Sequence, residues 1–192
     1  HGIARVKVVR RPRVAILATG DELASGSGRL AAGKIRNSNG PASAAALARW
    51  GACVVVSRVV RDDPAALRRA VRAALSRADL VLVTGGVSVG DFDYTQEVLK
   101  SVGARIVFWK VAMKPGKPLL LGLHGGKPVF GLPGNPVAVL VCLEEFVRPA
   151  LETLQGHAPG HPSYHLAGTT DNAYPKPGER QQYLFCRARA TG

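Results

Sequence analysis

Two acidic residues follow a short apolar run near the start of the chain. Residues 13–19 (RVAILAT) have the aliphatic composition of a buried strand and lead into Gly20, Asp21 and Glu22. Paired carboxylates at a strand end suit Mg²⁺, which prefers a few carboxylates together with waters and substrate phosphate. The alternative is that Asp21 or Glu22 only caps a turn, and this segment alone leaves the two interpretations equal.

A second candidate segment, residues 84–93 (TGGVSVGDFD), is a glycine-rich loop after another apolar run. Glycines let backbone amides approach a ligand closely, and the loop also carries a hydroxyl and two carboxylates. The residues concerned are Gly85, Gly86, Ser88, Gly90, Asp91 and Asp93. The alternative is a tight turn between a strand and a helix, but the length and the acids of the loop favour ligand binding.

Two further segments offer sites for an anion. Residues 113–118 (MKPGKP) place Lys114 and Lys117 on a proline-stiffened loop, where two ammonium groups could hold a small oxyanion. Exposed lysines are more often only solvated. Residues 131–136 (GLPGNP) join a strand end to a helix start, where free amides favour an anion, and the alternative is an ordinary helix capped by Asn135.

Strands and helices alternate along the chain and would place these loops. The expected strands are residues 13–19, 52–60, 80–84, 105–111, 119–123 and 127–132, the last two joined as a hairpin through Gly125-Gly126. The expected helices are residues 37–50, 63–78, 94–102 and 135–154. The second helix is the firmest prediction, because Asp63-Pro64 supplies an N-cap and a proline at the first helical position.

This alternation predicts an α/β fold with a mostly parallel sheet covered by helices on both faces and with ligands at the carboxyl ends of the strands. We expect residues 1–11 to be the remnant of a linker, residues 12–156 to form the ligand-binding domain and residues 157–192 to be part of a β-rich C-terminal domain. In that tail only residues 183–189 (YLFCRAR) are strand-like. Both ends of the chain look like cuts in a longer protein.

The formal net charge is +13, from 26 Lys and Arg against 13 Asp and Glu, and it raises the question of a nucleic-acid partner. Much of the excess lies on one predicted helix face and near the N-terminus. No aromatic run interleaves with the basic residues, as a single-strand stacking surface would require. A small polyanionic substrate explains part of the charge, so nucleic acid is not the expected partner.

Other classes of protein find little support. Cys53, Cys142 and Cys186 are far apart and are expected to be buried free thiols, and neither a zinc site nor a disulfide framework is expected. The GxxxxGK[ST], GxSxG and HExxH motifs do not occur in the sequence. No apolar run is long enough to span a membrane and no signal pattern opens the chain, so we expect a cytoplasmic protein.

Five ordered motifs closely resemble those of the molybdopterin molybdotransferases, the family of bacterial MoeA and the gephyrin E domain. They are TGDEL at residues 19–23, RDDP at 61–64, TGGVSVGDFDYT at 84–95, MKPGKP at 113–118 and GLPGNP at 131–136. The resemblance covers residues 5–156 and implies that residues 12–156 are the molybdopterin-binding catalytic domain. The tail from Ser163 resembles the start of that family's small C-terminal β domain more weakly.

The resemblance implies the last step of molybdenum cofactor synthesis, in which adenylylated molybdopterin and molybdate react with Mg²⁺ and release AMP. It implies Glu22, Asp62 and Asp93 as metal ligands and catalytic acids, and Lys114 and Lys117 as catalytic residues that bind molybdate. The substrate-binding residues would be Thr19, Gly20, Asp21, Gly85, Gly86, Ser88, Gly90, Lys110, Pro133, Gly134, Asn135 and Pro136. The family's active site is completed across a homodimer by regions absent here, so the chain as given could bind its ligands and yet not turn over.

Two rival functions remain at this point. A molybdopterin adenylyltransferase shares the fold, a glycine-rich loop and an LPG-type loop, but TGDEL and MKPGKP favour molybdenum insertion. A scaffold or nucleic-acid-binding module would fit the basic charge, and its binding should collapse as a power of salt concentration.

Overall fold

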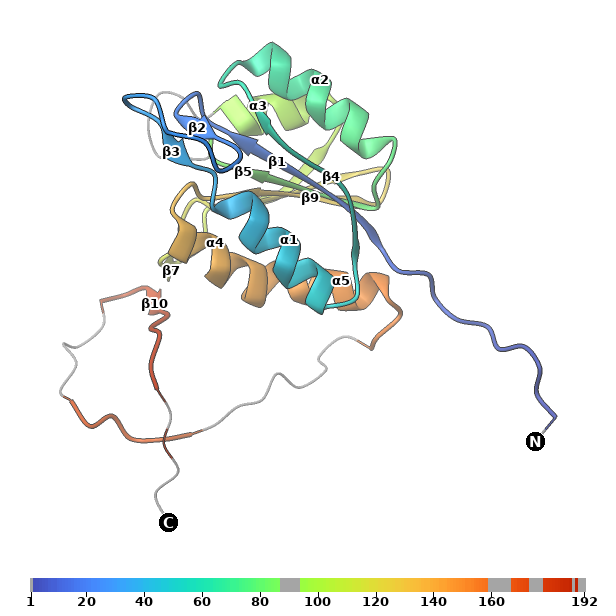
Figure 1. The fold of residues 1–192 in the computed structure, drawn as a ribbon. Coiled ribbons are helices and arrows are strands. Elements are labelled where there is room, and N and C mark those ends of the chain that lie inside the picture. Colours follow the sequence, from blue (N-terminus) through green and yellow to red (C-terminus); the bar gives the residue numbers. More distant parts are fainter. Residues whose placement is uncertain (1, 87–93, 159–166, 173–177, 188, 190–192) are drawn as a thin grey trace.

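The computed structural model describes residues 2–86, 94–158, 167–172, 178–187 and 189, and its centre is a six-stranded sheet (Figure 1). The strand order is β4-β1-β5-β9-β8-β6. The strands are β1 (Arg13–Thr19), β4 (Cys53–Val60), β5 (Leu80–Thr84), β6 (Arg105–Trp109), β8 (Leu120–His124) and β9 (Lys127–Leu132). β4, β1, β5 and β9 are parallel, and β8 runs antiparallel to both β9 and β6. The predicted α/β fold with a mostly parallel sheet is therefore confirmed.

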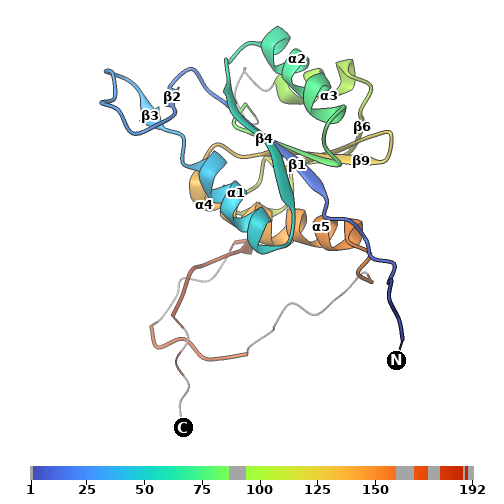
Figure 2. The same cartoon turned by 45° about the vertical axis from the view of Figure 1, so that its right-hand side comes forward.

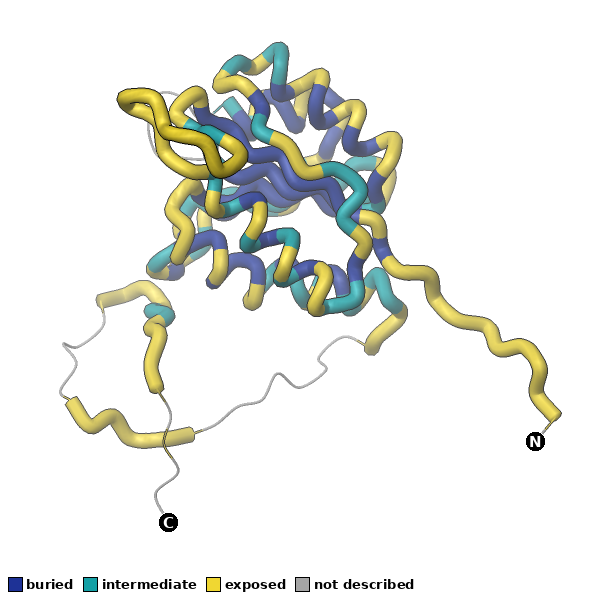
Figure 3. The backbone as a smooth tube through the Cα atoms, viewed as in Figure 1, coloured by how far each residue is buried: buried dark blue, intermediate teal, exposed yellow. Residues whose placement is uncertain are grey.

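Helices cover both faces of this sheet (Figures 1 and 2). One face carries α2 (Pro64–Leu75) and α3 (Tyr94–Ser101), and the other carries α1 (Asn39–Arg49), α4 (Pro136–Cys142) and α5 (Arg148–Leu154). The sheet alternates its side chains between the two layers, so that Ala15, Leu17 and Val81 pack under α2 while Ile16 and Leu82 pack over α1 and α4. Burial is concentrated in the sheet and on the inner helix faces (Figure 3).

The helix predicted over residues 135–154 is broken by a π-helical turn, Leu143–Val147, between α4 and α5. Pro149 gives the physical reason. It lacks an N–H donor, and its ring would clash with the carbonyl of Glu145 in a regular α-helix, which the wider turn relieves. The continuous helix predicted over these residues did not take this proline into account.

Two predictions of the sequence analysis are wrong. Residues 183–187 and 189 are not a strand; instead a two-residue strand, β10 (Gln181–Gln182), pairs in parallel with β7 (Met113–Lys114). A strand needs a partner for its backbone groups, and that pairing is only two residues long. Cys53 and Cys186 are exposed rather than buried, and only Cys142 lies in the core, where burial raises the pKa of its thiol to about 12.

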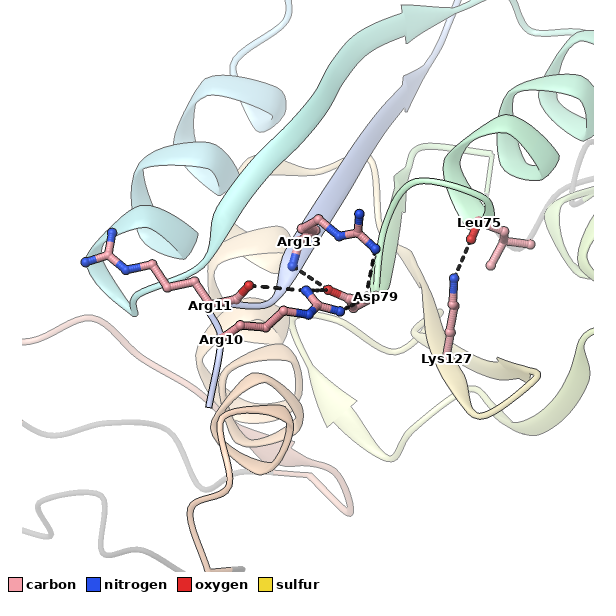
Figure 4. Close-up of polar contacts among 6 residues, drawn as sticks. All are labelled: Arg10, Arg11, Arg13, Leu75, Asp79 and Lys127. Carbon is pink, nitrogen blue, oxygen red and sulfur yellow. Dashed lines mark hydrogen bonds and ion pairs between the residues drawn. The ribbon is translucent and has the colours of Figure 1, made fainter. Parts of the chain in front are cut away.

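Ion pairs and hydrogen bonds stabilise the edge of the sheet where the parallel strands begin, called here the amino edge (Figure 4). Asp79, just before β5, accepts from both guanidinium nitrogens of Arg10 at 2.6 and 2.7 Å and from the backbone N–H of Arg13 at 2.8 Å. Lys127, at the start of β9, donates to the Leu75 carbonyl at the end of α2 at 2.6 Å. These contacts bind the N-terminal arm and α2 to the edge of the sheet away from the candidate site.

The hairpin turn between β8 and β9 lies at this amino edge too. Gly125 and Gly126 have φ angles of 55° and 80°, in the left-handed region that glycine adopts without cost. Both residues are exposed, and a Cβ atom added to either would meet no other atom within 4 Å.

No helix among the residues that the structure describes is long and apolar enough to cross a membrane.

Candidate functional site

The carboxylates of Asp21, Glu22 and Asp62 gather where β1 and β4 end side by side. Thr19 and Val60 are register partners at these strand ends, so Asp21 and Asp62 follow on neighbouring loops. The backbone N–H of Asp62 donates to the Asp21 carboxylate at 3.1 Å. Burial raises the pKa of Asp62, and the charges of Asp21 and Glu22 raise it further. The residue as a whole is exposed, but its carboxylate is partly shielded and faces like charges.

Gly20 lets the Glu22 carboxylate fold back over the strand end. A Cβ atom at Gly20 would lie 2.6 Å from the Glu22 Oε1 atom, and Gly20 has a φ of 147°. Any other residue here would displace the carboxylate. Asp21 does more than cap its own turn. Its carboxylate accepts a hydrogen bond from the backbone of Asp62, on the neighbouring loop.

A projecting segment, residues 23–36, follows Asp21 and Glu22. β2 (Leu23–Ala24) and β3 (Ile35–Arg36) pair in parallel and enclose an exposed glycine-rich loop (Figure 1). The Lys34 ammonium donates to the Asp21 carbonyl, and Arg36 donates to two carbonyls inside the loop. These basic side chains are bound to carbonyl oxygens, so the three carboxylates have no ion-pair partner among the described residues.

The glycine loop begins against β1. Gly85 has a φ of 85°, and a Cβ atom there would lie 2.5 Å from the Thr19 carbonyl oxygen, so only glycine fits. Gly86 has a φ of 66° and lies between the hydroxyls of Thr19 and Thr95, of which Thr95 donates to the Gly86 carbonyl at 2.9 Å. Ser88, Gly90, Asp91 and Asp93 lie outside the described residues, so their predicted roles stay predictions.

The loop of Pro133, Gly134 and Asn135 lies beside the glycine loop. The Gly85 N–H donates to the Leu132 carbonyl at 3.1 Å. Gly134 also lies next to Gly85, since a Cβ atom added to Gly134 would be in van der Waals contact with the Gly85 Cα atom at 3.9 Å. Asn135 caps α4 by accepting from the N–H groups of Val137 and Ala138 at 3.0 and 3.2 Å. The capping interpretation of Asn135 is therefore confirmed, and these two amides are already occupied. Pro136 is the exposed first residue of α4.

Asn39, at the start of α1, ties this loop to the helix layer. Its Nδ2 donates to the Gly134 carbonyl at 2.8 Å, while its Oδ1 is buried without a hydrogen-bond partner. From the sequence, Asn39 was only one of several cap-type residues near the start of a predicted helix. A second asparagine beside a helix start that already had cap residues was the one local signal. Nothing in the local sequence showed that the Asn39 amide would reach a loop 95 residues away.

The lysine loop lies between β6 and β8. The Lys110 N–H donates to the Leu119 carbonyl and the Val111 N–H to the Lys117 carbonyl, so the loop extends the antiparallel β6–β8 pair. Lys114 and Lys117 are exposed. Lys110 has a φ of 68°, unusual for a residue with a side chain, and its ammonium lies 3.9 Å from the centre of the Trp109 ring.

All of these loops therefore lie at the carboxyl edge of the sheet, but at different points along it. The acids follow β1 and β4, the glycine and proline loops follow β5 and β9 in the middle, and the lysine loop follows β6. No group of three or more His, Cys, Asp or Glu with the arrangement of a metal site is found among the described residues. Glu22 and Asp62 are the described members of the predicted metal set, whose third member is Asp93.

Comparisons with known proteins show which family the chain resembles. Residues 15–153 match the family model described as "Probable molybdopterin binding domain". A molybdopterin molybdenumtransferase of Nostoc sp. is 41% identical over 94% of the chain and 42% of its own length. One of Staphylococcus epidermidis is 46% identical over 81% of the chain and 37% of its own length. The chain thus spans about two fifths of these curated relatives.

Among solved structures, the molybdopterin biosynthesis MoeA protein of Pyrococcus horikoshii superposes with a TM-score of 0.69 at 33% identity, over 76% of this chain and 36% of that one. The family match runs from within β1 to within α5 and includes the acids, the glycine loop, the lysine loop and the proline loop. The chain belongs to the family of molybdopterin-binding domains.

Proposed function

We propose that this chain is the catalytic domain of a molybdopterin molybdenumtransferase, which inserts molybdenum into adenylylated molybdopterin and releases AMP. Relatives that carry this name are 41% and 46% identical to it. The observation that carries the proposal is the separation of charge along the carboxyl edge, with carboxylates beside β1 and β4 and lysines beside β6. Such an edge suits a long substrate that needs a cation at one part and an oxyanion at another.

The middle of the edge suits the phosphate and pterin part of the substrate. Gly85 and Gly86 bring the backbone close to β1 and leave no side chain over it. Asn39 and Asn135 hold the neighbouring loop through the Gly134 carbonyl and the first turn of α4. A preorganised loop costs little reorganisation when a ligand binds, so these contacts support substrate positioning.

The acids suit Mg²⁺. The Asp62 carboxylate is partly shielded and faces the like charges of Asp21 and Glu22, and carboxylate oxygens are the ligands that Mg²⁺ prefers. Glu22, Asp62 and Asp93 would hold the ion, which would supply positive charge at the phosphoanhydride bond that is cleaved to release AMP. Asp21 acts differently: its carboxylate fixes the Asp62 backbone and so orients that loop.

Lys114 and Lys117 are exposed on the proline-stiffened loop and bind molybdate as point charges in this proposal. Lys110 is held against Trp109 and contributes charge beside them. In the full-length protein we propose a homodimer that acts in the cytoplasm.

The test uses the full-length protein with adenylylated molybdopterin, molybdate and Mg²⁺, and measures AMP by chromatography. AMP release that requires molybdate and Mg²⁺ is expected. The same protein given ATP and molybdopterin should form no adenylylated product. Robust transfer of AMP to molybdopterin would instead show the rival adenylyltransferase.

A further inference from the structure

The segment Gln181–Tyr183, far along the chain from the family match, lies against the lysine loop. β10 pairs with β7 so that Gln181 is opposite Met113 and Gln182 opposite Lys114. The Gln181 N–H donates to the Ala112 carbonyl at 3.0 Å, and the Tyr183 N–H donates to the Lys114 carbonyl at 2.9 Å. These bonds hold the backbone at Ala112 and at Lys114.

The opposite side of the lysine loop is fixed by packing. Met113 is 1% exposed, and a Cβ atom at Gly116 would lie 2.7 Å from the Met113 Cε atom and 3.0 Å from the Cys142 Sγ atom on α4. The loop is therefore seated on the core between its two lysines. Lys114 and Lys117 remain exposed, so the contacts restrain the backbone and leave the ammonium groups accessible.

Tyr183 links the segment to the helix layer. Its hydroxyl donates to the Glu145 carboxylate on the π-helical turn at 3.3 Å. Its ring lines a cavity of about 770 Å³ together with side chains of α1 and α4. The tyrosine therefore connects two places, the Lys114 carbonyl through its backbone and the π-helical turn through its side chain.

We propose that Gln181–Tyr183 is a positioning element for the lysine loop, and that its two backbone hydrogen bonds set the affinity of Lys114 and Lys117 for molybdate. The inference rests on the proposed function, in which these lysines bind the oxyanion. A lysine has a long flexible side chain, so a fixed backbone reduces the conformational freedom that is lost on binding. Neither backbone bond depends on a side chain of the segment. A proline substitution therefore removes one bond, and an alanine at the same position controls for the lost side chain.

The test is titration calorimetry of molybdate alone into the 192-residue chain and its variants, with circular dichroism to compare their folding. Gln181→Pro removes the donor to Ala112, and its matched control Gln181→Ala keeps it. Tyr183→Pro and Tyr183→Ala form a second pair for the donor to Lys114. Each proline variant should bind molybdate about threefold to tenfold more weakly than its alanine control, the scale of one hydrogen bond.

Further variants separate this inference from the proposed function. Lys114→Ala combined with Lys117→Ala should abolish measurable molybdate binding. Absence of binding by the unchanged chain, or binding that survives the double substitution, would overturn the oxyanion site and the inference with it. Binding that needs the lysines but is equal in proline and alanine variants would overturn the positioning role alone. If one proline variant fails to fold, the other pair decides.

Discussion

Asp62 and Asp79 are both aspartates beside a strand end of the same sheet, and they lie at opposite edges in opposite surroundings. Asp62, at the carboxyl edge, faces the carboxylates of Asp21 and Glu22, and its pKa is raised. Asp79, at the amino edge, is bound by Arg10 and by the Arg13 backbone, and these bonds lower its pKa strongly. Like charges without partners cost stability and suit a ligand, whereas paired charges fasten the chain.

The largest effect should come from Asp93, which lies in sequence between β5 and α3 and outside the described residues. Asp93→Asn in the full-length protein should release AMP at least about a hundredfold more slowly, since electrostatic support of the transition state is lost. Its melting temperature should stay near that of the unchanged protein. Normal turnover with a lowered melting temperature would make Asp93 a helix cap and weaken the contrast between the edges.

A substitution at the amino edge should instead lower the stability of the chain. Asp79→Ala removes the acceptor of Arg10 and Arg13 and should lower the free energy of unfolding by about 1–3 kcal/mol, the scale of hydrogen bonds to a charged group. The exposed Arg10 side chain keeps the value in the lower part of that range. Urea unfolding measures it, with Asp171→Ala as the control because the Asp171–Arg189 ion pair is more than four fifths exposed on both sides.

Lowering the pH should affect stability in opposite directions through Asp79 and Asp62, because their pKa values are shifted in opposite directions. The pKa of Asp79 is lower in the folded chain than its ordinary value of about 3.9, so its contribution is complete above about pH 4 and is lost as the pH falls below that value. Unfolding free energies measured from pH 6 down to pH 2 should therefore fall less steeply in Asp79→Ala than in the unchanged chain. Equal slopes would mean that the contacts of Asp79 with Arg10 and Arg13 do not form in solution.

The smallest effect is expected from Asp62→Asn. The pKa of Asp62 is raised in the folded chain, so its ionised form costs stability as the pH rises through and above about 4. Removing the charge should raise the melting temperature slightly at pH 7 and leave it unchanged near pH 3. A lower melting temperature at pH 7 would show that Asp62 is held by a favourable contact, contrary to the comparison.

Local sequence signals predicted most of the sheet and its helices. The β5 and β9 strands and the α2 start were correct because each has a strong local cause, an aliphatic run or the Asp63-Pro64 cap. The acids and the glycine loop were placed at one edge because the carboxyl ends of parallel strands meet there. The contacts of Asn39 with Gly134 and of Tyr183 with Lys114 could not be predicted, since they join distant segments and leave no periodic pattern.

The β8–β9 turn is a suitable place to insert a label into the protein. Gly125 and Gly126 are exposed at the amino edge, with open space around them, and the hairpin's other end supports the lysine loop. Surface turns of this kind are the places where inserted sequence is best tolerated. A short epitope or a fluorescent label placed between the two glycines would mark the central sheet at the edge opposite the loops that are proposed to bind the substrate.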